Sequence, residues 1–224
     1  MTLRRHSLVW ITPAGWRALE AREPAWAEEL AAWARTERPL VARRHDADAA
    51  SGEVCLGLPL PPHPTLGKRR IALRVPASAI ERVEEALALD AVCASAPETW
   101  QLPLAQLQSD AAGAGIALRV FGSVAWQALT GLEYLSETSD IDLLFAPGDA
   151  AALQRGLELL TTHARALPLD GEILFPSGRA VSWKEWLLAD TCAAGTRVLV
   201  KHEHGVALEP AGALMDELSR GGVQ

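Results

Sequence analysis

Two aspartates at alternate positions of an apolar run are the residues of this sequence best suited to chemistry. Asp140 and Asp142 flank Ile141 and precede the apolar residues 143–145. Side chains alternate between the two faces of a strand, so both carboxylates would share one face. Two close carboxylates repel each other unless a cation lies between them, and hard oxygen ligands suit Mg²⁺. We therefore predict a Mg²⁺ site, with Mn²⁺ as the alternative metal, rather than an acidic strand end in solvent.

A glycine and a serine upstream of this pair supply a candidate phosphate site. Gly122 and Ser123 lie between the apolar run 116–121 and a predicted helix at 124–130. A glycine lets a phosphate approach the backbone, because it has no Cβ. The free N–H groups at a helix start favour an anion, and the Ser123 hydroxyl adds a donor. Alone this pattern is weak, but beside Asp140 and Asp142 it indicates a phosphate held against a metal.

A third carboxylate would complete a two-metal site, and the sequence offers two candidates. Asp170 and Glu172 lie on one face of a predicted strand at 169–175. We expect Asp170 to be the third metal ligand and catalytic carboxylate, with Glu172 as the competing choice or as a substrate contact. Lys201 ends a later predicted strand and could reach a phosphate, although a surface lysine is the simpler interpretation.

Basic side chains concentrate in the first third of the chain. Residues 1–80 hold 12 of the 21 Lys and Arg but only 8 of the 28 Asp and Glu, in a protein of net charge −7. Arginine binds phosphate through paired donors and lysine binds it as a point charge, so these clusters could hold substrate phosphates or attract an acidic protein. A solvated basic rim is an equal alternative. The candidate substrate-binding residues are Arg43, Arg44, Lys68, Arg69 and Arg70.

The elements that must position these residues indicate a mixed α/β (α+β) fold with two domains. We place an N-terminal mixed α/β domain at residues 1–95 and a catalytic domain, a mixed sheet with flanking helices, at 96–224. Proline-rich residues 54–64 predict a non-helical loop, and Ser78 with Glu81 predicts a capped helix after Pro76. Asp149 predicts the cap of a helix ending near His163. Further strands are expected at 7–11, 40–44, 71–75, 198–201 and 206–208, and further helices at 104–112, 184–189 and 210–220.

Composition narrows the class of protein. A dedicated nucleic-acid binder would carry more positive charge than this chain, and no apolar run approaches the length of a membrane span. The three cysteines, Cys55, Cys93 and Cys192, fit neither a disulfide framework nor a zinc spacing. We expect a cytoplasmic protein that binds neither nucleic acid nor membrane.

The combination of Gly-Ser, Asp-x-Asp and a later strand carboxylate resembles the motifs of the polymerase-beta-type nucleotidyltransferase superfamily. The segment between Ser123 and Asp140 is longer than in the minimal members of that superfamily. The fuller pattern is more specific, and it spans nearly the whole chain. It closely resembles the phosphoribosyl-dephospho-CoA transferase family of malonate decarboxylase, also called malonate decarboxylase holo-acyl-carrier-protein synthase. The segments that carry this resemblance are RHSLVWI, RPLVARR, LGLPLPP, KRRIALRVP, FGSVAWQALTGLEYLSETSDIDLL, LDGEILFPSGRAVSWKEWL and VLVK.

The resemblance implies a specific reaction. Family members transfer a phosphoribosyl-dephospho-CoA group from 2′-(5″-triphosphoribosyl)-3′-dephospho-CoA to a serine of the apo acyl carrier subunit of malonate decarboxylase, and pyrophosphate leaves. Asp140 and Asp142 match the family's metal-binding pair. Two alternatives stay open: another nucleotidyltransferase that modifies a small molecule or protein, and a non-catalytic nucleotide-binding module.

Overall fold

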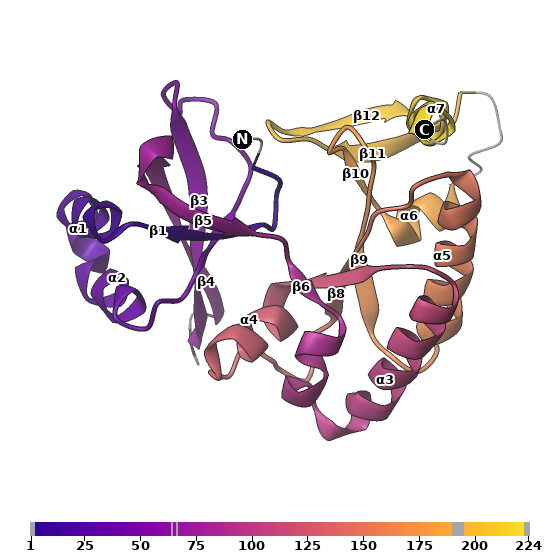
Figure 1. The fold of residues 1–224 in the computed structure, drawn as a ribbon, viewed down its shortest axis with the longest axis horizontal. Coiled ribbons are helices and arrows are strands. Elements are labelled where there is room, and N and C mark those ends of the chain that lie inside the picture. The colour runs from indigo at the N-terminus through magenta and orange to yellow at the C-terminus, as the bar shows by residue number, and fades with distance from the viewer. Residues whose placement is uncertain (1–2, 64, 66, 190–194, 222–224) are drawn as a thin grey trace. The chain divides into compact units, whose positions relative to one another are not determined.

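The computed structural model describes residues 3–63, 65, 67–189 and 195–221, so Cys192 lies outside the described residues. Its internal contacts divide the chain into two compact units, Met1–Ala86 and Leu87–Gln224. The boundary expected from the sequence lay between residues 95 and 96. Both units combine sheets with helices, which confirms the predicted α/β class (Figure 1).

Unit 1 is built on a five-stranded antiparallel sheet with the order β4-β3-β2-β1-β5. Helix α1 begins after Thr12, whose Oγ1 accepts a hydrogen bond from the Gly15 amide at 3.1 Å. The strands are β1 (Leu8–Ile11), β2 (Leu40–Ala42), β3 (Glu53–His63), β4 (Gly67–Pro76) and β5 (Ile80–Glu84). The helices are α1 (Pro13–Arg22), η1 (Pro24–Trp26), α2 (Ala27–Ala34) and η2 (Ala77–Ala79).

Two predictions for unit 1 are wrong, and sheet pairing explains both. The proline-rich run is not a loop, because its described residues, 54–63, belong to strand β3. Pro59, Pro61 and Pro62 lie beyond the residues of β3 that pair with β2, where one edge of the strand needs no N–H donor. The helix expected after Pro76 is only the short turn η2, followed by strand β5. Residues of β5 pair with β1, and this ladder overrides the local capping signal of Ser78 and Glu81.

The described residues of unit 2 form a seven-stranded sheet with the order β12-β11-β10-β9-β8-β7-β6, in which β8 and β9 run parallel and the other neighbouring strands antiparallel. Its strands are β6 (Leu87–Ala88), β7 (Leu118–Phe121), β8 (Ile141–Phe145), β9 (Leu169–Leu174), β10 (Ala180–Ser182), β11 (Arg197–Lys201) and β12 (Val206–Pro210). Its helices are η3 (Asp90–Ser95), α3 (Glu98–Gly113), α4 (Gly122–Thr130), α5 (Ala150–His163), α6 (Trp183–Leu188) and α7 (Ala211–Gly221).

Most of these elements confirm the sequence analysis. The Asp149 carboxylate caps α5 as predicted, because Oδ1 accepts a hydrogen bond from the Ala152 amide at 2.7 Å. Helix α3 begins earlier than expected, at Glu98, and continues through Pro103. Pro103 is the sixth residue of the helix, beyond the first turn, so it removes one i→i−4 hydrogen bond from α3.

One face of the unit 2 sheet packs against helices and forms the core. Ile141, Leu143 and Phe145 of β8 are all buried, and they belong to one apolar cluster with residues of α3, α4, α5, α6 and α7. Figure 1 shows α3 and α5 running beside each other in this unit, and the two helices are in contact. Because side chains alternate along a strand, Asp142 and Leu144 lie on the opposite face. That opposite face carries the candidate site.

Candidate functional site

The centre of the site is the contact between Gly122 and Asp142. Gly122 follows strand β7, which ends at Phe121, and is the first residue of helix α4, with a backbone φ of +72°. Phe121, the residue before it, is the register partner of Asp142 on β8. A Cβ added to Gly122 would overlap the Asp142 carboxylate, chiefly its Oδ2 atom. Both the positive φ and this close approach require glycine, so the glycine-serine bend and the aspartate form one local structure.

The start of helix α4 beside this contact is suited to an anion. Ser123 is buried, and the N-cap residue of α4 is Phe121, whose side chain makes no capping hydrogen bond. The first turn of a helix has N–H groups without intrahelical partners and a partial positive charge. A phosphate placed here would therefore meet backbone donors on one side and the Asp142 carboxylate on the other.

Asp170 lies next to Asp142 on the neighbouring strand. The two residues are register partners in the parallel pair β8 and β9, so their side chains share the face of the sheet opposite the core. The Asp170 Oδ1 atom accepts a hydrogen bond from the Gly171 amide at 2.7 Å, and Oδ2 lies 3.9 Å from the Lys184 Nζ atom. Gly171 itself lies against the Leu143 backbone, where a Cβ would not fit. The parallel pairing thus brings two of the three predicted catalytic carboxylates together.

Glu172 and Lys201 form an ion pair on the same face. Glu172 is 5% exposed, and its Oε1 atom accepts a hydrogen bond from the Lys201 Nζ atom at 2.7 Å. A buried carboxylate that is already bonded to a lysine is a poor choice for an additional metal ligand. Between the two candidates for a third carboxylate, this geometry favours Asp170. Glu172 and Lys201 instead bind each other beside it.

Asp140 lies just before β8 and is partly exposed. In the described part of the chain, no group of three or more His, Cys, Asp or Glu side chains is arranged to hold a metal ion. The fit of a divalent cation therefore depends on the donors themselves: the carboxylates of Asp140, Asp142 and Asp170 are hard oxygen ligands, and Asp142 and Asp170 lie on adjacent strands. These residues suit Mg²⁺ or Mn²⁺ in chemical type, and the metal stays a prediction.

Two basic residues on this face were missed by the sequence analysis. Arg119 of β7 pairs with Leu144 and so lies on the face that carries the carboxylates. Arg119 is two residues from Phe121 on the same strand, so the period of two along a strand could have indicated this position. Lys184 approaches Asp170 from the first turn of α6. No sequence pattern indicated Lys184, because its place depends on how β10 pairs with β9.

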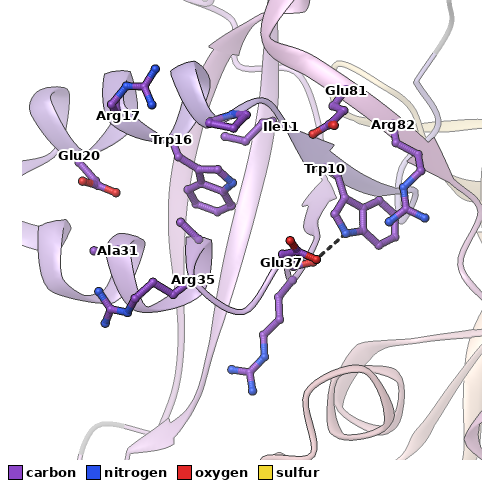
Figure 2. A pocket seen from close by; sticks show the side chains of 13 residues that line it. Trp10, Ile11, Trp16, Arg17, Glu20, Ala31, Arg35, Glu37, Glu81 and Arg82 are labelled. Carbon is purple, nitrogen blue, oxygen red and sulfur yellow. Dashed lines mark hydrogen bonds between the residues drawn. The ribbon is translucent and has the colours of Figure 1, made fainter.

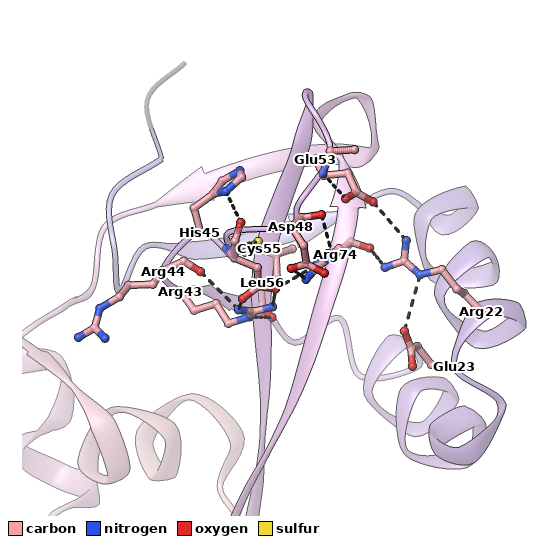
Figure 3. A network of polar contacts seen from close by, with 12 residues as sticks. Arg22, Glu23, Arg43, Arg44, His45, Asp48, Glu53, Cys55, Leu56 and Arg74 are labelled. Atoms are coloured by element: carbon pink, nitrogen blue, oxygen red, sulfur yellow. Dashed lines mark hydrogen bonds and ion pairs between the residues drawn. The ribbon is translucent and has the colours of Figure 1, made fainter. Parts of the chain in front are cut away.

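The five basic candidates from the first third of the chain all lie in unit 1, and they have different surroundings. Arg43 is held inside a network, where its Nη2 atom donates to Asp46 Oδ2 at 2.6 Å and its Nε atom donates to the Leu56 carbonyl at 2.9 Å (Figure 3). Arg69 lies over the Trp26 ring, with 5.6 Å between the guanidinium carbon and the ring centroid. Lys68, Arg44 and Arg70 are exposed, and the last two line a hollow in the sheet.

Comparison with known protein families gives matches over both units. Residues 4–86 match the model described as the phosphoribosyl-dephospho-CoA transferase MdcG N-terminal domain. Residues 86–211 match the model described as the MdcG C-terminal domain of the same transferase. The chain belongs to the phosphoribosyl-dephospho-CoA transferase family.

Individual relatives support this membership along almost the full length. A phosphoribosyl-dephospho-CoA transferase of Xanthomonas campestris pv. campestris (strain 8004) is 40% identical over 215 residues, covering 95% of this chain and 97% of the relative. Its namesake from Bradyrhizobium diazoefficiens is 40% identical over 185 residues, covering 81% and 80%. Another, from Pseudomonas putida (strain GB-1), is 28% identical over 208 residues, covering 92% of each. No solved structure matches the chain.

No helix among the described residues is both long enough and apolar enough to pass through a lipid bilayer. The family matches span the candidate site, since residues 122, 142, 170 and 172 all fall within the C-terminal model.

Proposed function

We propose that this protein transfers a phosphoribosyl-dephospho-CoA group from 2′-(5″-triphosphoribosyl)-3′-dephospho-CoA to a serine of the apo acyl carrier subunit of malonate decarboxylase, in the cytoplasm and with release of pyrophosphate. The observation that carries the proposal is the contact of the Asp142 carboxylate with the Gly122 bend, beside Asp170 on the parallel strand. This arrangement supports phosphoryl-group transfer of the polymerase-beta type, and the family name supports the dephospho-CoA donor.

The triphosphate of the donor would lie against the start of helix α4. There the amides of Gly122 and Ser123 would bind phosphate oxygens, and Lys184 and Arg119 would add positive charge from the same face. These contacts would orient the α-phosphorus on the face of the sheet that carries the carboxylates. Positioning of this kind is the main contribution a protein makes to phosphoryl transfer.

Asp142, Asp170 and Asp140 would hold Mg²⁺. The bound ion would polarise the serine hydroxyl and neutralise negative charge on the leaving pyrophosphate. In the transfer itself, the carrier serine oxygen forms a bond to the α-phosphorus, the bond to the β-phosphate oxygen breaks, and the hydroxyl proton passes to a carboxylate of this face. The product is a phosphodiester, with no covalent intermediate on this chain.

Glu172 and Lys201 have a positioning role in this scheme. Their ion pair ties β9 to β11 across the intervening strand β10. It holds β9, and therefore Asp170, in place behind the reacting groups. Because the Glu172 carboxylate is bound to Lys201, it also does not compete for the metal.

The test is to incubate the full chain with the apo carrier subunit, the triphosphate precursor and Mg²⁺, and to measure the intact mass of the carrier. We expect the carrier to gain the mass of one phosphoribosyl-dephospho-CoA group and a carrier with serine replaced by alanine to gain none. An unmodified wild-type carrier would show that the proposed acceptor or donor is wrong.

A further inference from the structure

A hollow in the sheet of unit 1 is lined by basic side chains. Its volume is ≈ 350 Å³, and it is bounded by residues that precede β1 and by residues of β2, β3 and β4. The charged and titratable residues in its lining are Arg5, His6, Arg43, Arg44 and Arg70. Among the described residues that line it, none is Asp or Glu. The hollow therefore presents positive charge to whatever enters it.

Small residues make the floor of this hollow. Val41 of β2 pairs with Gly57 of β3, and Gly57 pairs with Ala72 of β4, so the three positions lie side by side on one face of the sheet. Gly57 has no side chain and Ala72 has only a methyl group. The sheet surface is therefore open at this point, while long basic side chains stand around it.

Two of the surrounding arginines have no competing partner within the described part of the chain. Arg44 and Arg70 are exposed, and neither side chain makes an ion pair or hydrogen bond there. Arg43 differs, because Asp46 already binds its guanidinium (Figure 3). Elsewhere in the lining, the Arg5 Nη2 atom lies 2.9 Å from His6 Nε2. Arg44 and Arg70 are thus the exposed arginines of the lining that have hydrogen-bond donors to offer.

A second hollow of unit 1 provides the contrast. It has a volume of ≈ 830 Å³ and lies among α1, α2, β1 and β5 (Figure 2). Its arginines are mixed with acids, and Arg82 is stacked on the Trp10 ring at 3.7 Å. The charged residues of its lining are Arg17, Arg35, Arg38, Arg82, Glu20, Glu37 and Glu81. The absence of acids therefore sets the smaller hollow apart from this one.

We propose that the smaller hollow binds the diphosphate group of a nucleotide, with Arg44 and Arg70 as the principal contacts. Planar guanidinium groups bind phosphate oxygens in pairs, which suits two arginines around a shallow floor. The volume lies at the low end of small-molecule sites and fits phosphate groups better than a protein surface. Naming the nucleotide as dephospho-CoA rests on the proposed function, whereas the phosphate site itself does not.

The experiment is calorimetric titration of the full chain with inorganic pyrophosphate and, separately, with dephospho-CoA. EDTA is present throughout, so that metal-dependent binding at the carboxylates of unit 2 does not contribute. We expect wild-type protein to bind both probes and the double variant Arg44→Gln/Arg70→Gln to bind each at least tenfold more weakly. The matched control is Arg35→Gln, an exposed arginine of the other hollow, which we expect to stay within twofold of wild type.

A second variant tests the hollow without removing an arginine. Ala72 is exposed on β4, so Ala72→Glu would place a carboxylate at the floor with little strain, and it should also weaken pyrophosphate binding at least tenfold. Unchanged affinity in both variants, or no pyrophosphate binding by wild type, would overturn the site. If the double variant bound pyrophosphate as wild type does but no longer bound the apo carrier subunit, the phosphate site would also be overturned, in favour of an acidic protein partner. Binding of pyrophosphate without dephospho-CoA would overturn the nucleotide assignment alone.

Discussion

The Asp142 carboxylate lies so close to the Gly122 backbone that no side chain fits at position 122. This relationship joins two segments that are separate in the sequence, the strand-helix bend and the acidic strand. It also fixes the side of the sheet on which a phosphate could meet both backbone amides and a carboxylate-bound metal.

Replacing Gly122 with alanine should damage the site specifically. The added Cβ would displace Asp142, so we expect activity to fall at least tenfold, together with a stability loss of about 1–2 kcal/mol from the positive φ. Gly131→Ala is the matched control, because Gly131 has a φ of +68° but open space around its Cβ position. Steady-state kinetics and urea unfolding of both variants measure the two effects. Equal activity in the two variants would contradict the role of the contact.

Removing the Asp142 carboxylate should abolish metal-dependent turnover. Asp142→Asn, and likewise Asp140→Ala, should lower kcat/KM by roughly 100-fold or more, because metal stabilisation of transition-state charge is worth several kcal/mol. Thermal unfolding should change little. Asp216→Asn, an exposed aspartate on α7, serves as the control. Full activity in either site variant would remove that residue from the catalytic assignment.

The Glu172–Lys201 pair should contribute to stability more than to substrate affinity. Lys201→Met removes the hydrogen bond to a carboxylate that is 5% exposed, and we expect a loss of about 1–3 kcal/mol in the free energy of unfolding. Lys184→Met is the comparison, because Lys184 is half-exposed and 3.9 Å from its aspartate, so unfolding should be almost unaffected. The KM for the triphosphate precursor distinguishes a role of Lys201 in stability from a role in substrate binding. A large rise in KM for Lys201→Met at unchanged stability would assign Lys201 to the substrate.

Because of the Asp46 network, the free energy of unfolding of unit 1 should fall as the pH becomes acidic. Hydrogen bonds from Arg43, and then from Arg74 at 2.8 Å, hold the pKa of the Asp46 carboxyl well below its usual range (Figure 3). A lowered folded-state pKa stabilises the protein above the unfolded value of about 3.9, and this contribution is lost as the pH falls toward the folded-state value. Asp46→Asn should therefore cost about 1 kcal/mol at pH 7, and the difference should shrink below about pH 4.

Urea unfolding of wild type and Asp46→Asn between pH 7 and pH 3 measures this dependence. Glu28→Gln, which removes an exposed acid of α2 in the same unit, is the control and should show no such trend. A cost that stays constant down to pH 3 would contradict the assignment to Asp46.

Local patterns predicted the parts of the fold that depend on neighbouring residues. The alternation around Ile141 correctly placed Asp142 opposite the core, and Asp149 correctly marked the start of α5. The helix expected at Ser78 and Glu81 was wrong, because pairing of β5 with β1 decides that segment. The neighbours Asp142 and Asp170, and the partners Glu172 and Lys201, depend on strand order across the sheet. Strand order is set by long-range packing that no short window of sequence contains.

The central claim is that Asp142 and Asp170 share a divalent cation opposite the Gly122 bend. The most direct measurement is an anomalous difference map from crystals of the full chain soaked with Mn²⁺ and pyrophosphate. We predict a peak within coordination distance, about 2.2 Å, of oxygens from both carboxylates, with pyrophosphate at the start of α4. A peak bound to other residues, or none at these two aspartates, would contradict the account.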